Sequence, residues 1–387
     1  MENPHETFPP LRDDQRMMLN SVARLVDEVV APRAAEVDRT AQFPWDLQKA
    51  FAKQGLFGLP IAEQYGGLGE SLLMQALVME EITRGCFTSA MIVGTPAICV
   101  YPMELLASEE QKRRYFPKIA TGECTPCVAY SEPEAGSDLA SLRTTAVRKK
   151  DHYLLNGQKR WITHAPVADL VVLFARTDPG SRDHRGISAF VVDKNAEGIS
   201  IGRMEDKLGA RGSVMSDLIF EDAKIPLDAL LGEEGKGFIT AMNSLEKERI
   251  LAGALALGCS RGAIDYAVRY AKERRQFGRA IGEFQGLQFL LADMRTKYEA
   301  GRALLIQAAQ KNDAGSSDRT MACAMAKFYA SETAMEITSH AVQVLGGYGV
   351  TREYPVERMM RDAKVTQIFA GTSQIQQLVI ARKMLDL

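Results

Sequence analysis

The strongest constraint on the fold is a change in the periodicity of apolar residues along the 387-residue chain. From residue 11 to residue 120, apolar residues recur at helical spacing. We expect Pro32, Pro44 and the glycine-containing run 64–69 to divide this segment into short helices. From Gly237 onward the pattern is helical again, and the long helices it predicts indicate a bundle. Loops are expected near residues 275–282, 313–318 and 346–354.

The middle segment alternates apolar and polar residues in short runs that are typical of strands. Asn156-Gly157 predicts a tight turn between strands 153–155 and 158–163, because both central positions of such a turn need positive φ. No helical segment separates the strands, so we expect an antiparallel barrel or sandwich. The predicted domains are residues 1–123, mainly helical, residues 124–235, mainly β, and residues 236–387, a helical bundle.

Composition excludes several classes of partner. The net charge is -2, so the chain offers no basic field for nucleic acid or an anionic membrane. The most apolar stretch, residues 89–103, is interrupted by Gly94 and Pro96 and is expected to be too short to span a bilayer. The polar first ten residues resemble no export signal, and six scattered cysteines form no disulfide framework. We therefore expect a cytoplasmic protein without a metal site.

Glu248 is a candidate catalytic residue because it falls on an apolar helix face. It lies three residues after Leu245 and four before Ala252 on the helix that begins near Gly237. A carboxylate there must be paired, solvated by a cleft, or raised in pKa. A raised pKa suits a base that removes a weakly acidic C–H proton. The alternative is a salt bridge to Lys247 or Arg249, or a position at a helix–helix boundary, and helix position alone favours this alternative.

Five motifs, in the same order, are similar to the flavin-site signatures of the acyl-CoA dehydrogenase family. Each is weak alone, but five in order over about 250 residues are a specific signal. The resemblance covers nearly the whole chain and implies a mainly α fold: an N-terminal helical domain, a central antiparallel β-barrel or sandwich, and a C-terminal four-helix bundle. The motifs lie at residues 128–138, 161–163, 274–278, 343–349 and 361–375.

The resemblance implies FAD as the cofactor. In the family the first signature holds the flavin ring and pyrophosphate, and Trp161-Ile162-Thr163 lies against the isoalloxazine. The motif with Arg274 and Phe277 reaches the FAD of a neighbouring subunit, which implies a homo-oligomer, usually a tetramer. His164 stands where asparagine is usual. The residues expected to bind FAD are Val128, Tyr130, Ser131, Gly136, Ser137, Trp161, Ile162, Thr163, Arg274, Phe277, Gln285, Gln343, Gly346, Gly347, Thr372 and Gln374.

The same resemblance assigns the catalytic base. Many members carry a glutamate just before Gly-Thr-Ser, where this chain has Ala370. Isovaleryl-CoA and long-chain dehydrogenases instead carry the base on the mid-chain helix, at the position of Glu248. The backbone N–H of Ala370 remains available for the thioester carbonyl. The residues expected to contact the substrate are Ser137, Leu245, Glu246 and Arg249.

The implied activity is that of an oxidoreductase acting on CH–CH groups, in fatty acid or branched-chain amino acid catabolism. Glu248 would remove the α-proton of an acyl-CoA, flavin N5 would accept the β-hydride, and electrons would pass to an electron-transfer flavoprotein. Alternatives on this scaffold are an acyl-CoA oxidase and a flavin-dependent lyase or desulfinase. Loop 207–216 departs from the usual Ser/Thr-rich version, which leaves an acyl carrier protein open as the carrier. A flavin-binding protein without catalysis is a further alternative, given Ala370.

Overall fold

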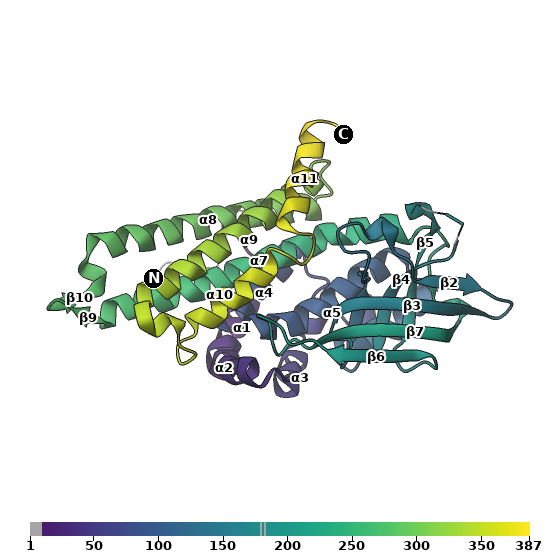
Figure 1. Cartoon of the computed structure of the whole chain (residues 1–387), viewed down its shortest axis with the longest axis horizontal. Helices are drawn as coiled ribbons and strands as arrows, with labels where there is room; N and C mark the ends of the chain where they lie inside the picture. Colours follow the sequence, from purple (N-terminus) through teal and green to yellow (C-terminus); the bar gives the residue numbers. More distant parts are fainter. Residues whose placement is uncertain (1–9, 179, 182) are drawn as a thin grey trace.

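The computed structural model describes residues 10–178, 180–181 and 183–387 and has the predicted helix–sheet–helix order (Figure 1). Short helices come first, and two of them start with a serine cap. Ser71 Oγ accepts a hydrogen bond from Met74 N at 3.2 Å, and Ser108 forms a capping box with Gln111. The six α-helices are α1 (Asp13–Leu25), α2 (Ala31–Thr40), α3 (Trp45–Lys53), α4 (Leu72–Gly85), α5 (Phe87–Leu106) and α6 (Glu109–Ala120).

Two proline-based predictions for these helices are wrong. Pro32 lies in the first turn of α2, where its missing N–H costs nothing, and the π-helical turn Val26–Val30 joins α1 to α2. The helix α5 continues through Gly94 and Pro96 for 20 residues. By length and composition alone it could cross a membrane, but 72% of its apolar window is buried inside the protein. It is therefore placed as a core helix.

The middle segment forms one eight-stranded sheet with the order β6-β7-β3-β2-β4-β5-β8, and β1 pairs with β4. Most pairs are antiparallel, as expected, but β1 and β2 each pair with β4 in parallel, so the sheet is mixed. The strands are β1 (Pro126–Ala129), β2 (Thr145–Arg148), β3 (His152–Thr163), β4 (Leu170–Arg176), β5 (Ile187–Asp193), β6 (Ile199–Met204), β7 (Met215–Pro226) and β8 (Leu230–Leu231).

The tight turn predicted at Asn156-Gly157 is wrong. β3 passes straight through these residues and pairs with β7 on both sides of them, with a register shift between Leu155 and Gly157. Gly157 has φ +140°, and a Cβ there would stand 2.7 Å from Thr144 Cα. Glycine is thus needed at this position, because the bulge requires positive φ and the chain just before β2 comes close. The turn does not form because the pairing of β3 with β7 over many residues outweighs the local turn preference.

The C-terminal segment is a helical bundle built around α7 and α9. The five helices are α7 (Gly237–Glu273), α8 (Gln285–Asp313), α9 (Arg319–Leu345), α10 (Val356–Thr366) and α11 (Ser373–Met384). A small hairpin, β9 (Arg275–Gln276) and β10 (Arg279–Ala280), occupies the loop expected near residues 275–282. In Figure 1 this hairpin lies at one end of the molecule and the sheet at the other, while α11 projects from the bundle.

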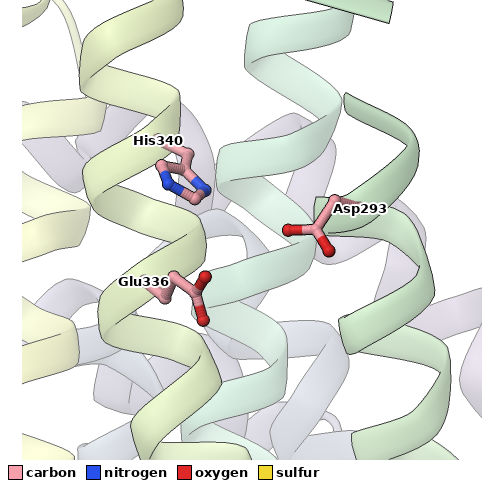
Figure 2. Close-up of side chains that lie close together, drawn as sticks. All are labelled: Asp293, Glu336 and His340. Atoms are coloured by element: carbon pink, nitrogen blue, oxygen red, sulfur yellow. The ribbon is translucent and has the colours of Figure 1, made fainter. Parts of the chain in front are cut away.

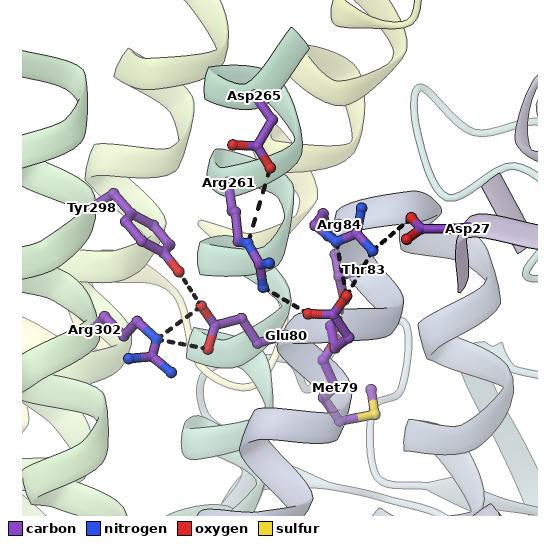
Figure 3. Close-up of polar contacts among 10 residues, drawn as sticks. Asp27, Met79, Glu80, Thr83, Arg84, Arg261, Asp265, Tyr298 and Arg302 are labelled. Carbon is purple, nitrogen blue, oxygen red and sulfur yellow. Dashed lines mark hydrogen bonds and ion pairs between the residues drawn. The ribbon is translucent and has the colours of Figure 1, made fainter. Parts of the chain in front are cut away.

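A buried ionic network fixes α4 against α7 and α8 (Figure 3). Glu80 of α4 accepts hydrogen bonds from Tyr298 Oη at 2.5 Å and from Arg302 Nε at 3.2 Å, both on α8. The next residue, Glu81, lies 2.6 Å from Arg261 of α7. Charges this deeply buried hold a fixed geometry only when paired. The network therefore sets the position of the helix that carries Met79.

Candidate active site

A cavity of about 150 Å³ lies where α4, α5 and α7 meet the edge of the sheet. Three parts of the chain that are distant in sequence contribute to it. The helices supply an apolar wall, the sheet supplies the side with Trp161, and the turn before α11 closes the third side. The lining residues are Met79, Met91, Gly94, Thr95, Ile98, Val128, Tyr130, Ser131, Trp161, Ile162, Thr163, Glu248, Leu251, Ala252, Leu255, Phe369 and Ala370.

Glu248 is the carboxylate that lines this cavity. Its side chain is only 6% exposed, and Oε1 accepts a hydrogen bond from Tyr130 Oη at 2.9 Å. Burial raises the pKa of Glu248 to about 7, although the Tyr130 hydrogen bond and nearby Arg249 lower it. Lys247 points elsewhere and pairs with Glu104 at 3.1 Å. Glu248 is therefore a buried carboxylate that forms no salt bridge within the described part of the chain.

The segment after β1 is held rigidly against the sheet. Lys159 Nζ donates to Tyr130 O at 3.0 Å and to Glu132 Oε1 at 2.8 Å, and Lys159 is fully buried. Glu132 also accepts from the backbone N–H groups of Arg143 and Thr144. Tyr130 stacks on Phe174 with ring centroids 4.7 Å apart. These contacts fix the tyrosine that contacts Glu248.

A bulge presents Trp161 to the cavity. The pairing of β3 with β7 shifts register between Lys159 and Ile162, and Trp161 has φ +57°. Trp161 N donates to Asp217 Oδ1 at 3.2 Å, which holds the strained backbone. The indole is 52% exposed although it borders an apolar cavity. Bulges of this kind re-aim a side chain next to a functional site.

His164 follows this bulge but does not line the cavity. It is fully buried against Phe43, and its Nε2 lies 3.1 Å from Ser213 Oγ. Burial lowers its pKa to about 3, so the ring is neutral. Its Nδ1 has no hydrogen-bond partner within the described residues.

A second cavity of about 650 Å³ lies at the hairpin end of the bundle. Arg274, Phe277 and Gln343 line it, together with Gly346 and Gly347. Apart from the adjoining residues, no atom of the described chain lies within 4 Å of the place where a Cβ would stand on either glycine. Phe277 is 92% exposed, so its ring has little of this chain to pack on. An open glycine pair beside an arginine fits the phosphate or adenosine part of a dinucleotide.

The two cavities are lined by different stretches of α7 and its C-terminal end. Arg274 follows α7 directly, 26 residues after Glu248, which is about 39 Å along a helix. A second copy that brought its hairpin to this chain's sheet would bring the two sets of predicted cofactor residues together.

Several predicted site residues line neither cavity. Thr372 instead caps α11 by accepting a hydrogen bond from Ile375 N at 3.2 Å. Glu246 pairs with Arg319 at 2.9 Å and accepts a hydrogen bond from the Thr320 hydroxyl. Arg249 is buried, and its Nε has no hydrogen-bond partner in the described chain. The other predicted residues outside both cavities are Gly136, Ser137, Leu245, Gln285 and Gln374.

Sequence reasoning missed the contribution of the N-terminal helices. Met79 of α4 and Met91, Thr95 and Ile98 of α5 form one wall of the cavity. Thr95 Oγ1 is buried there without a hydrogen-bond partner in the described chain. A threonine between apolar residues of a buried helix was the only available signal.

One group of metal-ligating residue types, Asp293, Glu336 and His340, lies between α8 and α9 (Figure 2). The Lys297 ammonium is 2.8 Å from Asp293 Oδ2 and also contacts Glu336. A cation is thus already placed between the two carboxylates. Asp293 and Glu336 therefore form an interhelical salt bridge with Lys297.

Comparisons with known proteins identify the family to which this chain belongs. Family models for the N-terminal, middle and C-terminal domains of acyl-CoA dehydrogenases match residues 12–123, 127–223 and 235–385. The chain belongs to the acyl-CoA dehydrogenase family. It is 42% identical over 375 residues to the short-chain specific acyl-CoA dehydrogenase of Clostridium acetobutylicum, covering 97% of this chain and 98% of that one.

Solved structures of the acyl-CoA dehydrogenase fold superpose closely. Butyryl-CoA dehydrogenase from Megasphaera elsdenii has a TM-score of 0.94 at 36% identity, covering 97% of this chain and 99% of that chain. A chain from a structure described as the electron transferring flavoprotein of Acidaminococcus fermentans has a TM-score of 0.94 at 42% identity, covering 97% and 98%.

This acyl-CoA dehydrogenase family member is an FAD-dependent oxidoreductase that acts on acyl-CoA thioesters. The residues present fit that cofactor. The exposed indole of Trp161 offers a face for a flat ring, and the open Gly346-Gly347 pair offers room for the other end. Held at Trp161–Thr163, the isoalloxazine would lie in the same cavity as Glu248.

Proposed function

We propose that Glu248 is the base that removes the α-proton in the dehydrogenation of an acyl-CoA. One observation carries the proposal: the carboxylate that lines the Trp161–Thr163 cavity is buried and has a pKa of about 7. A base with a pKa near the working pH combines an ionised resting state with a strong pull on the proton. The hydrogen bond from Tyr130 orients the carboxylate and still leaves Oε2 to accept the proton.

The chain also offers a donor for the thioester carbonyl. Ala370 lines the cavity, and its backbone N–H makes no hydrogen bond within the described residues. A donor there stabilises the negative charge that develops on the carbonyl oxygen when the α-proton leaves. The helices exclude water around the acyl group through Met79, Met91 and Ile98. When bound, FAD accepts the β-hydrogen as a hydride.

We propose a short acyl group as the substrate. A cavity of about 150 Å³ holds a group of about the size of benzene. Part of the space belongs to the flavin edge, so the acyl tail has less. The names of two similar proteins, a short-chain specific dehydrogenase and a butyryl-CoA dehydrogenase, agree with this size.

We further propose a homo-oligomer, with a tetramer as the expected form, that passes electrons to an electron-transfer flavoprotein in the cytoplasm. The separation of the two cavities supports a shared cofactor site, and exposed apolar residues on α8 and α11, Phe289 and Leu378, support burial against other copies. The A. fermentans structure supports the electron partner. Six free cysteines agree with a reducing compartment. The domain boundaries at 123/124 and 235/236 stay predictions.

A panel of thioesters mixed anaerobically with the yellow protein tests the function. Butyryl-CoA should bleach the flavin faster than octanoyl-CoA or palmitoyl-CoA, and a butyryl thioester of acyl carrier protein should be poorer. Peroxide formation in air that matches turnover with an artificial acceptor would indicate an oxidase instead. A protein that no acyl thioester bleaches would contradict the proposal.

A further inference from the structure

The turn before α11 has an unusual backbone. Ala370 and Gly371 both have positive φ, at +52° and +84°. Positive φ is energetically unfavourable for a residue other than glycine, so surrounding contacts must stabilise this conformation of Ala370. The Ala370 N–H lies on this turn and makes no hydrogen bond within the described residues. The orientation of this N–H therefore depends on what holds the rest of the turn.

Both carbonyl groups of the turn are held by buried side chains. Gln376 Nε2 donates to Ala370 O at 3.1 Å and to Gly371 O at 2.9 Å. Lys327 Nζ donates to Gly371 O at 2.7 Å. Both donors are fully buried. A Cβ on residue 371 would stand 2.6 Å from Gln376 Nε2, so the amide also needs glycine at this position.

Burial of the Lys327 ammonium group destabilises the fold, which indicates that the group has a specific role. It forms no salt bridge with a carboxylate in the described part of the chain, and burial lowers its pKa to about 8. The charge of Glu332 raises this pKa, and the charge of Arg249 lowers it. An isolated buried cation destabilises a protein unless its hydrogen bonds compensate. Within the described residues, its only hydrogen bond is to the turn that carries Ala370.

We propose that Lys327 and Gln376 are positioning residues that clamp the Ala370–Gly371 turn by its carbonyl oxygens and so aim the Ala370 N–H at the thioester carbonyl. The clamp rests on the proposed function. Neither side chain lines the cavity, so both act through the backbone of the turn. The positive charge of Lys327 on Gly371 O also sets a favourable field behind the donor while the substrate oxygen gains negative charge.

The test compares holoenzyme variants Lys327→Met and Gln376→Leu with wild type. The control is Lys364→Met, an exposed lysine on α10 that contacts Gln367. The infrared band of the thioester carbonyl is recorded with bound crotonyl-CoA, because a hydrogen bond lowers its frequency. Steady-state kcat and KM with butyryl-CoA and the thermal unfolding temperature are measured on the same samples.

The clamp predicts that both variants move the carbonyl band toward that of free crotonyl-CoA and lose about tenfold in kcat, a part of what a lost donor costs. KM should change less than kcat. The Lys327→Met protein should unfold at the same or a higher temperature, because a buried charge is gone. If that variant does not fold, the Gln376→Leu protein carries the test.

A carbonyl band and a kcat equal to those of wild type in the variants would overturn the clamp. So would a loss of kcat that only follows loss of FAD or of thermal stability. If no acyl-CoA bleaches the flavin of the wild-type protein, both the proposed function and the clamp are rejected. Wild-type bleaching with an unshifted band in the variants removes the clamp alone.

Discussion

Tyr130 Oη lies 2.9 Å from Glu248 Oε1, and this contact joins the end of β1 to the middle of α7. Burial and the nearby carboxylate raise the pKa of Tyr130 well above its usual value, so the phenol stays protonated and donates. A neutral donor stabilises an ionised carboxylate without neutralising it. Glu248 is thus oriented by a group that cannot take its proton.

Replacing Glu248 by glutamine should abolish the function while preserving the fold. Glutamine keeps the size and an oxygen for Tyr130, but it cannot accept the α-proton. We expect kcat/KM with butyryl-CoA to fall about 10²- to 10⁴-fold. Anaerobic flavin bleaching measures the effect, and Glu299→Gln, a change at an exposed carboxylate on α8, serves as the control. Undiminished bleaching in the Glu248→Gln protein would remove this residue from the mechanism.

The pH dependence of the reaction should follow the pKa of Glu248. The base works only when ionised, so kcat/KM should rise about tenfold per pH unit below pH 7 and level off above it. Tyr130→Phe removes a hydrogen bond that lowers this pKa, so the inflection should move to higher pH. Stopped-flow bleaching rates measured from about pH 5.5 to about pH 9 provide the profile. An inflection that stays fixed or moves down would contradict the assignment.

A glutamate introduced at residue 370, on another wall of the cavity, should be able to replace Glu248 as the base. Ala370 and Glu248 line the same cavity, and family members carry a glutamate at the position of Ala370. Glu248→Ala combined with Ala370→Glu should therefore recover bleaching that Glu248→Ala alone lacks. The control combines Glu248→Ala with Ile368→Glu, since Ile368 is exposed and outside the cavity. Equal rates in the two double variants would refute the geometry.

A single substitution in the Glu80 network should destabilise the fold more than replacement of the whole network. Glu80→Ala leaves Arg302 buried without this carboxylate partner and should cost about 3–5 kcal/mol. Replacing the set together, as Glu80→Met, Tyr298→Phe and Arg302→Met, should be much less costly. Unfolding midpoints of the holoenzyme measure both. The exposed Arg295–Glu299 pair on the same helix gives a control in Glu299→Gln, expected within about 0.5 kcal/mol of wild type.

Subunits with different defects should repair each other. Arg274→Glu damages the hairpin cavity and Glu248→Gln damages the base, so each variant alone should be inactive. Co-expressed in equal amounts, mixed pairs contain one intact site, and roughly a quarter of wild-type activity should return. Activity of the purified mixed oligomer measures the effect. No recovery in oligomers that demonstrably contain both chains would show that the cofactor site is not shared.

The sequence predicted what depends on periodicity and missed what depends on distant contacts. Glu248 stood out because helical spacing placed a carboxylate on an apolar face. Its hydrogen bond to Tyr130 joins residues 118 positions apart, and no local pattern encodes such a pair. Asn156-Gly157 had the chemistry of a turn, but pairing with β7 along the whole of β3 outweighed it.

Lys327 shows a signal that could have been used. It is a single lysine within a run of alanine, methionine and cysteine on α9, which predicts a buried charge with a purpose. The identity of its partner could not be predicted, because Gly371 comes 44 residues later and across a turn. Pro32 and Pro96 were misjudged for a different reason: a first-turn position and tertiary packing compensate the missing N–H groups.

The placement of the proposed base on α7 and of its phenolic partner after β1 has a practical consequence. Cutting the chain between Gly235 and Lys236 would put the two groups on separate polypeptides, just before α7 begins. Neither piece could bleach a flavin by this route, whereas the rejoined pair could. The molecule would then act as a colour reporter for fragment reassembly, with reconstitution visible as the return of thioester-dependent bleaching.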